Sequence, residues 1–219
     1  MENPPSDLLP PLLHSIRELV HEFDDIPSSR RALLHQLTEY LQRRREGPLY
    51  LNFICTHNSR RSHIAQIWAQ TAAYYYQVPD VTCYSGGTEA TAFNPRAVKA
   101  LRDVGFSIIE KQSGSNPIYE VRFAESAPPL LAFSKTFNDP FNKADKFAAV
   151  MTCAHADENC PYIPEASARI ALTYNDPKDF DDTPLEAQKY AERVREIGRE
   201  MFFAFSGEGM GGGSGVPTS

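Results

Sequence analysis

The chain has 219 residues, of which 42% are apolar and 11% aromatic, and its formal net charge is −6. This composition excludes a collagen, a coiled coil and a disordered chain, and the acidic balance argues against a nucleic-acid-binding protein. Mean hydropathy is −0.42, and no stretch approaches the roughly 20 apolar residues that a membrane span needs. The N-terminus lacks the cleavage site of a signal peptide, so we expect a cytoplasmic protein with neither nucleic acid nor membrane as partner.

The first part of the chain, residues 1–48, predicts a helical hairpin. Apolar residues recur at helical spacing on both sides of an interruption at Pro27. Ser28 or Ser29 is a possible N-cap for the second helix, whose apolar stripe covers 32–41. We therefore expect an N-terminal helical extension that precedes the main domain.

Residues 49–205 alternate between strand-like and helix-like patterns. Short apolar runs predict strands, and apolar residues at every third or fourth position predict helices. Such alternation is typical of a parallel sheet with helices on both faces. The predicted strands are 49–54, 81–85, 146–151 and 169–173, and the predicted helices begin at Ser62, at Asn94-Pro95 and at the capping box Thr183-Pro184-Leu185-Glu186.

Two segments differ from this alternation. Residues 113–145 predict an inserted hairpin with Pro128-Pro129 at or near its turn. The end of the chain, 206–219, holds six of the 12 glycines and is expected to be a flexible tail without chemistry.

The stretch that carries the chemistry runs from Cys55 to Ser62, between a predicted strand and a predicted helix. A loop wrapped around a helix start aims backbone N–H groups inward, cradles an anion and favours the thiolate form of a cysteine at its beginning. Arg61 offers a planar fork that matches two oxygens of a tetrahedral oxyanion, and Ser62 can donate to the thiolate. The pattern therefore predicts Cys55 as a nucleophile toward phosphorus or arsenic. The residues expected to contact the anion are Thr56, His57, Asn58, Ser59, Arg60 and Arg61.

Phosphoryl transfer by a cysteine also needs an acid that protonates the leaving oxygen. Asp176 follows a predicted strand, and the carboxyl ends of parallel strands share one edge of a sheet, so we expect its carboxyl group beside the cysteine loop. Pro177 stiffens the backbone directly after it. Three further carboxylates on this loop are more typical of solvated side chains: Asp179, Asp181 and Asp182.

Together these features resemble the low-molecular-weight protein tyrosine phosphatase fold. They are more similar still to the thioredoxin-coupled arsenate reductases built on that fold, whose loop reads Cys-Thr-Gly-Asn-Ser-x-Arg-Ser. The resemblance covers residues 49–112 and 146–205, and implies a three-layer α/β sandwich with a four-stranded parallel sheet. Further residues that fit are Trp68, Tyr84-Ser85 with Gly86, and Asn94-Pro95.

The resemblance implies a redox role for the pair Cys153 and Cys160. In that scheme Cys55 attacks arsenate, Cys153 attacks Cys55 and releases arsenite, and Cys160 closes a disulfide with Cys153 that thioredoxin reduces. Two other interpretations stay open for the pair: a metal site that includes His155, and core thiols with no redox role. Cys83, in a predicted strand, is interpreted as a plain core residue.

The sequence also departs from the family pattern. His57 replaces the usual glycine of the loop, and Arg60 stands in place of its second cysteine. Gln66 replaces the glutamate of reductases with a potassium site, which puts a bound potassium ion in doubt. Lys178 and Asp179 replace the aromatic residues that flank phosphotyrosine in the phosphatases, which favours a small oxyanion as substrate.

The leading hypothesis is thioredoxin-linked arsenate reduction without a cofactor. The first alternative is a phosphomonoesterase, including a protein tyrosine phosphatase, that acts through a cysteinyl-phosphate. A second alternative is a protein that binds an anion or a partner in the same cradle without turnover.

Overall fold

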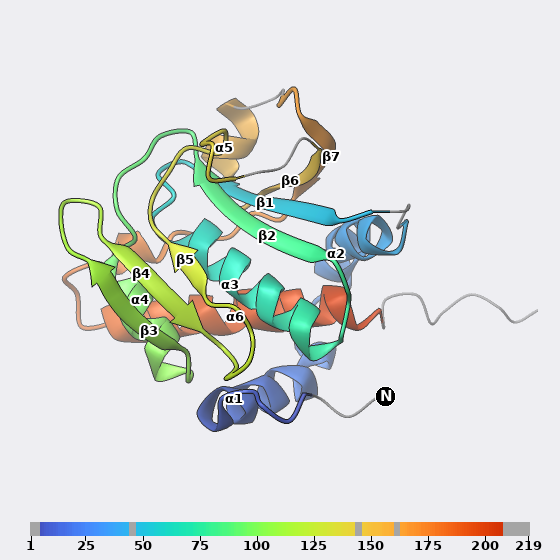
Figure 1. Cartoon of the computed structure of the whole chain (residues 1–219), viewed down its shortest axis with the longest axis horizontal. Coiled ribbons are helices and arrows are strands. Elements are labelled where there is room, and N and C mark those ends of the chain that lie inside the picture. Colours follow the sequence, from blue (N-terminus) through green and yellow to red (C-terminus); the bar gives the residue numbers. More distant parts are fainter. Residues whose placement is uncertain (1–4, 44–46, 143–145, 160–162, 208–219) are drawn as a thin grey trace, which may run out of the picture.

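The computed structural model describes residues 5–43, 47–142, 146–159 and 163–207, and its centre is a parallel sheet (Figure 1). The sheet has four strands in the order β2-β1-β6-β7. This arrangement confirms the predicted α/β fold class. The strands are β1 (Leu49–Cys55), β2 (Val81–Gly87), β6 (Phe147–Met151) and β7 (Ala166–Ala171).

The two middle strands are continuous apolar runs because both faces of the sheet are covered. The last five residues of β1 and all five residues of β6 are buried. Cys55 pairs with Gly87 at the carboxyl end of β1, and Ile54 pairs with Met151 at the end of β6. The loops that follow these strands therefore leave the sheet at one edge, where the candidate site forms.

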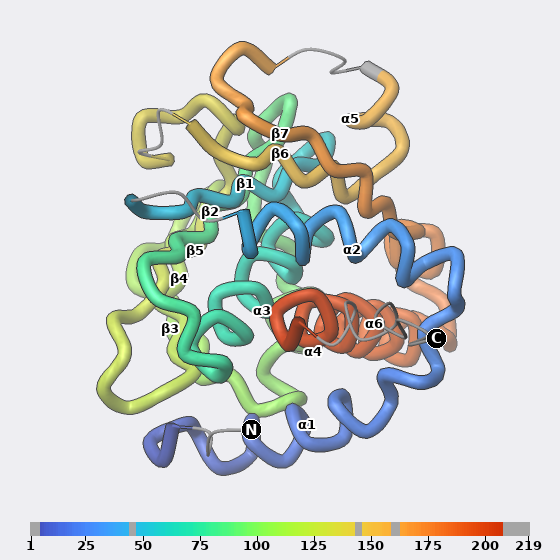
Figure 2. The backbone as a smooth tube through the Cα atoms, turned by 90° about the vertical axis from the view of Figure 1, so that its right-hand side faces the viewer, coloured from blue at the N-terminus to red at the C-terminus, as the bar shows by residue number. Residues whose placement is uncertain are grey.

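Helices cover the two faces of the sheet unequally (Figure 2). One face packs against α2 (Ser28–Gln42) and α3 (Arg61–Tyr75), with the long α6 (Glu186–Ser206) behind them. The other face carries the short α5 (Ala154–Asn159) and a small apolar cluster that contains Ile54 and Met151. The result is the expected three-layer sandwich.

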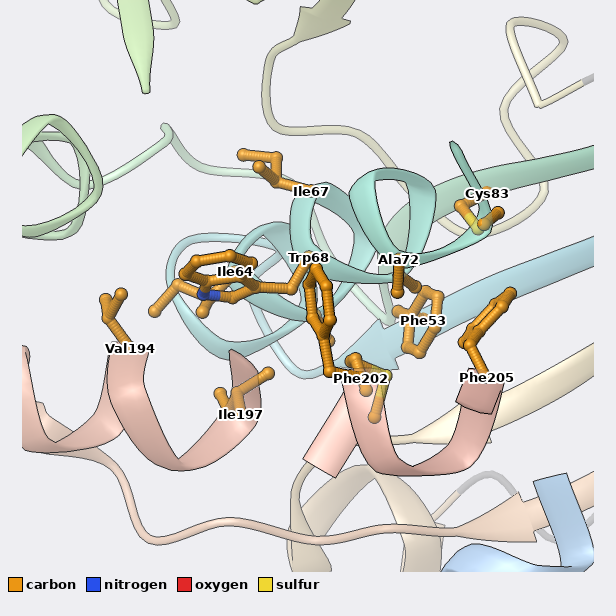
Figure 3. Close-up of a cluster of buried hydrophobic side chains, with 14 of the residues drawn as sticks. Phe53, Ile64, Ile67, Trp68, Ala72, Cys83, Val194, Ile197, Phe202 and Phe205 are labelled. Carbon is orange, nitrogen blue, oxygen red and sulfur yellow. The ribbon is translucent and has the colours of Figure 1, made fainter. Parts of the chain in front are cut away.

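The main core lies between α3 and α6 around Trp68, which is fully buried (Figure 3). Its ring packs edge-on against Phe202 of α6, with centroids 5.8 Å apart. Gly198 of α6 allows this approach, because a Cβ there would lie 2.7 Å from the Trp68 ring and 2.9 Å from Leu19. Three helices thus meet at one glycine.

The N-terminal residues form α1 (Pro10–His21), the 3-10 turn η1 (Phe23–Asp25) and α2. Both helices pack on α6 and bury leucines and isoleucines against it, which makes the hairpin part of the main core. The predicted serine cap is wrong in detail: Pro27 is the N-cap residue of α2, and Ser28 is already helical. The domain boundary after residue 48 stays a prediction.

A second sheet of three antiparallel strands lies beside α4 (Pro95–Asp103) at one side of the molecule (Figure 1). Its hairpin falls within 113–145, and Pro128-Pro129 directly precede the last strand. The first strand is not among the predicted strands, and its outer half is exposed and polar. The strands are β3 (Ser107–Gln112), β4 (Ile118–Arg122) and β5 (Leu130–Ala132).

Some predicted ends are shifted in the structure. The strand predicted at 169–173 is β7, which begins and ends earlier. The capping box does not start a helix at Pro184: after the 3-10 turn η2 (Pro177–Phe180), α6 begins at Glu186. The Glu186 carboxylate accepts a hydrogen bond from the Asp182 backbone N–H at 2.7 Å, so the glutamate of the predicted box reaches back to Asp182 and not to Thr183.

Helices long and apolar enough to cross a membrane are absent from the described part of the chain. Of the predicted tail, only Ser206 and Gly207 belong to that part, and Gly207 ends α6 in the left-handed conformation (φ 74°).

Candidate active site

The candidate nucleophile Cys55 ends β1 and is buried at the base of the loop that leads into α3. Its Sγ lies 3.1 Å from the Oγ of Ser62, in the first turn of α3. The Asn58 amide nitrogen donates to the same hydroxyl oxygen at 2.9 Å. With its oxygen accepting from Asn58, the Ser62 hydroxyl keeps its own proton available for a hydrogen bond to the Cys55 sulfur.

Asn58 holds the loop in its curled shape. It is fully buried and adopts a left-handed backbone conformation (φ 45°). Its amide oxygen accepts from the backbone N–H of Lys135 at 2.9 Å. Gly87 opposite cannot carry a side chain, since a Cβ there would lie 2.6 Å from the Thr56 carbonyl oxygen and 2.7 Å from the Asn58 nitrogen. Lys135 and Gly87 are not among the predicted site residues, because neither belongs to the loop itself.

Arg61 is fixed by the loop that follows β7. Its Nη1 donates to the Tyr174 carbonyl at 2.8 Å, and its Nη2 donates to Asp176 Oδ2 at 2.6 Å. The Nε of Arg61 is buried and has no hydrogen-bond partner among the described residues. Residues 115 positions apart are thus paired, and the buried Nε–H of the guanidinium remains for an anion.

The Arg60 guanidinium is bonded to α6 and to the loop before it. Its Nε donates to the Tyr190 hydroxyl at 2.8 Å, and its Nη2 lies 3.4 Å from Asp181 Oδ2. The Tyr190 hydroxyl donates to Asp181 at 2.8 Å, and burial together with this carboxylate raises the pKa of Tyr190 to about 12. Arg60 is therefore already neutralised, and Asp181 is a bound partner rather than a solvated loop carboxylate.

Six of the described residues line a small open hollow above the sulfur. None of these six is Phe, Tyr or Trp, so they offer no wall that stacks on a phenyl ring. The predicted anion contacts Thr56 and Asn58 are not in the lining. Asn58 is buried beneath the loop, and the hydroxyl of Thr56 points to a second cysteine. The lining residues are Cys55, His57, Ser59, Arg60, Arg61 and Asp176.

The second cysteine, Cys153, lies directly behind the loop. It follows β6, is almost fully buried, and its sulfur accepts from the Ala156 backbone N–H at 3.3 Å. The Thr56 hydroxyl lies 3.5 Å from that sulfur and 3.2 Å from Nδ1 of His155. One residue of the anion loop thus touches the candidate relay cysteine.

Cys160 lies outside the described residues, so its distance from Cys153 is not defined. Within the described ranges, no three His, Cys, Asp or Glu side chains are grouped so that they could hold a metal ion.

Cys83 is buried in β2, and burial raises the pKa of its thiol well above the usual range, which keeps it protonated. Gln66 is also buried, and its amide donates to the Cys83 carbonyl at 2.9 Å, so a neutral amide engaged by the backbone occupies this position.

Comparison with known proteins gives the family. The arsenate reductase of Halalkalibacterium halodurans is 31% identical over 150 residues, which is 68% of this chain and 89% of that protein. The arsenate reductase of Bacillus subtilis is 32% identical over 150 residues, again 68% of this chain and 89% of that protein. No protein-family model matches the chain.

Two solved structures resemble this one at low sequence identity. A low-molecular-weight phosphotyrosine phosphatase from Vibrio cholerae has a TM-score of 0.46 at 16% identity, over 72% of this chain and 94% of that chain. A thioredoxin-dependent arsenate reductase from Corynebacterium glutamicum has a TM-score of 0.42 at 17% identity, over 89% and 96%. The family assignment depends on the sequence relatives, which cover most of their own length.

These relatives are enzymes, which removes the interpretation of the chain as a binding protein without turnover. Arsenate reduction is the activity that they support, with an arsenate or phosphate oxyanion as substrate. The chain belongs to the family of arsenate reductases that is built on the low-molecular-weight phosphatase fold.

Proposed function

We propose that this protein reduces arsenate to arsenite by a cysteine relay that thioredoxin recharges. The observation that carries this proposal is the position of Cys153, which lies behind the Cys55 loop and within reach of the Thr56 hydroxyl. A phosphatase has no use for a second buried thiol at this place, whereas a reductase needs one to take over the bond from the nucleophile.

In the binding step, the oxyanion enters the hollow and displaces the Asp176 carboxylate from the Arg61 guanidinium. The Arg61 Nε has no other partner among the described residues, and Nη2 is the N–H that the carboxylate now holds. Backbone N–H groups at the start of α3 complete the cradle. The displaced Asp176 carboxyl group is then free to protonate an oxygen of the substrate.

In the redox step, two thiols supply the two electrons that reduce arsenic and become a disulfide. Cys55 thiolate attacks arsenic and an arsenate hydroxyl leaves as water, with its proton from Asp176. Cys153 thiolate attacks the Cys55 sulfur, so that the S–As electron pair passes to arsenic, As(V) becomes As(III), and arsenite departs. Cys160 then attacks Cys153 and frees Cys55, and a thioredoxin dithiol supplies two electrons to the resulting disulfide.

The test is arsenate turnover with thioredoxin, thioredoxin reductase and NADPH, run beside hydrolysis of an aryl phosphate. Cys153→Ser and Cys160→Ser should each abolish multiple-turnover arsenate reduction and leave aryl phosphate hydrolysis largely intact, because ester hydrolysis moves no electrons. After one equivalent of arsenate, peptide mapping should find a 55–153 disulfide in Cys160→Ser and a 153–160 disulfide in the parent. Cys83→Ser is the matched control and should turn over like the parent, since this thiol is buried away from the loop.

The second candidate is a phosphomonoesterase, which the Asp176–Arg61 pair beside Cys55 favours. A cysteine nucleophile, an arginine fork and an acid are sufficient for phosphate ester hydrolysis. The six described lining residues include no Phe, Tyr or Trp, which favours a small phosphate ester over phosphotyrosine. If both cysteine variants reduce arsenate like the parent, or if arsenate leaves neither disulfide, the relay is wrong and this second function replaces it.

A further inference from the structure

A buried ion pair joins the N-terminal hairpin to α6. Arg30, in the first turn of α2, donates from Nε and Nη2 to the two carboxylate oxygens of Glu200, each at 2.8 Å. The Glu200 side chain is only 3% exposed and that of Arg30 is 17% exposed. Such a two-pronged pair fixes the plane and position of the Arg30 guanidinium.

The same guanidinium covers the ring of Tyr174. Its Cζ lies 4.6 Å from the ring centroid, which is the geometry of a cation–π contact. The Tyr174 side chain is buried beside both members of this ion pair, and burial together with the Glu200 carboxylate raises the pKa of its hydroxyl. The ring is therefore held by packing and by the Arg30–Glu200 pair.

Tyr174 is also the residue whose carbonyl holds Arg61. The Arg61 Nη1 donates to this oxygen at 2.8 Å. On its other side, the Tyr174 backbone N–H donates to the Thr152 carbonyl at the end of β6 at 3.1 Å. The Tyr174 residue is thus held by one sheet-edge bond through its N–H and by the clamped ring, and its carbonyl accepts from one side of the Arg61 fork.

We propose that Arg30 is a positioning residue for Arg61, so that the N-terminal hairpin helps to orient the anion-binding fork of the active site. The inference rests on the proposed binding of an oxyanion by Arg61. Its path runs from Glu200 to Arg30, through the ring and carbonyl of Tyr174, to the Arg61 guanidinium.

Stability alone does not account for this ion pair. Burying two charges costs desolvation, and apolar replacements of such pairs are often neutral or stabilising. The hairpin has other ties to α6 that do not touch Tyr174: Arg195 donates to Glu22 at 2.9 Å and to Glu18 at 3.2 Å, on the exposed side. The pair at Arg30 differs from these because the Arg30 guanidinium covers the ring of Tyr174, two residues before Asp176.

The test measures binding of inorganic phosphate to the full-length protein by NMR titration, which resolves weak affinities. Arg30→Met/Glu200→Met removes the clamp and leaves no unpaired buried charge. It should weaken phosphate binding about tenfold, the size of effect expected for loss of one partly buried cation–π contact. Tyr174→Leu removes the ring, keeps the carbonyl and should weaken binding to a similar degree.

A double-mutant cycle separates positioning from general destabilisation. In an Arg61→Lys background, whose ammonium has no fork to orient, the clamp substitutions should change phosphate affinity less than about twofold. Arg195→Met is the matched control: it loosens the hairpin at its exposed side and should bind phosphate like the parent. If the clamp variant and Tyr174→Leu bind phosphate like the parent, or if the clamp effect is equally large in the Arg61→Lys background, the inference is overturned.

Arsenate turnover, measured on the same proteins, distinguishes a failure of the positioning role from a failure of the proposed function. A parent that reduces no arsenate, but shows the coupling in phosphate affinity, contradicts the reductase proposal and supports the positioning role. A parent that reduces arsenate, with a clamp variant that binds phosphate unchanged, contradicts the positioning role alone.

Discussion

At the scale of single residues, the site is an arrangement of competing partners around Arg61. Its guanidinium is bonded to Asp176 at 2.6 Å, and both side chains are largely buried. An oxyanion carries the same sign of charge as the Asp176 carboxylate and approaches the same N–H. The acid of the proposed mechanism is therefore also the group that the substrate has to displace.

Asp176→Asn should separate these two roles. Removing the negative charge should tighten phosphate binding, because the competitor at Arg61 becomes a neutral amide. The same substitution should slow aryl phosphate hydrolysis by about 10²–10⁴-fold, since the leaving oxygen loses its acid. Phosphate inhibition constants and kcat measured on one protein sample check both directions. An Asp176→Asn enzyme that keeps parental kcat would remove Asp176 from the acid role.

At the scale of elements, the segment around Lys135 braces the anion loop from outside. Its backbone N–H donates to Asn58, and its carbonyl accepts from Gly87 at 2.9 Å. The Lys135 ammonium is buried over the rings of Phe133, at 4.5 Å, and Phe141, at 5.2 Å. Burial lowers the pKa of Lys135 to about 8, because keeping the ammonium charged in the folded protein costs free energy.

The cost of that buried ammonium predicts a pH effect on stability. Above about pH 8 the folded chain releases the proton of Lys135, while the unfolded chain keeps it up to about pH 10.5. The unfolded state then binds more protons, so the contribution of Lys135 to the free energy of unfolding rises with pH across this window and is flat below it. The drop in pKa from 10.5 to about 8 corresponds to about 3 kcal/mol.

Urea unfolding at several pH values checks this effect against Lys135→Met. The free energy of unfolding of the parent, relative to the variant, should increase between about pH 8 and pH 10.5. Titration of the buried tyrosines is common to both proteins and cancels in the difference. A difference that stays constant over this range would mean that Lys135 remains charged in the folded protein.

At the scale of the whole molecule, the anion site lies where the sheet, α3 and α6 converge, and the hairpin packs on the same long helix. Trp68, Gly198 and Leu19 bring three helices into contact within the core. The loops after β1, β6 and β7 each contribute to the site, so the loop conformation and the packing of the fold depend on one another. Ligand binding to that site is expected to stabilise the entire chain.

Phosphate should raise the melting temperature by mass action. At a concentration of about 100 times Kd the gain is about 2.7 kcal/mol, or roughly 5–10 °C for a chain of this size. Arg61→Lys should lose most of the shift, because a point charge cannot replace the fork that meets two oxygens. Differential scanning fluorimetry in phosphate and in chloride of equal ionic strength provides the comparison. Equal shifts for both proteins would contradict the two-pronged role of Arg61.

The sequence by itself determined the parallel sheet and the local form of the anion loop. Strands such as β1 and β6 are continuous apolar runs, and Cys55, Arg61 and Ser62 belong to one contiguous strand–loop–helix unit, so periodicity and spacing carry the information. The strand β3 was missed because its exposed half is polar and has no alternation that a core would impose.

Only the tertiary structure decided which distant residues complete the site. The partners of Arg61 lie 113 and 115 positions away, and Arg30 meets Glu200 across 170 positions. Hydrophobic patterning specifies which face of an element is buried, but it does not specify which charged or polar side chains meet there. Arg60 illustrates the limit: its place in the loop predicted an anion contact and it does line the hollow, but only the packing of α6 against the loop decided that its guanidinium also bonds to Tyr190 and Asp181.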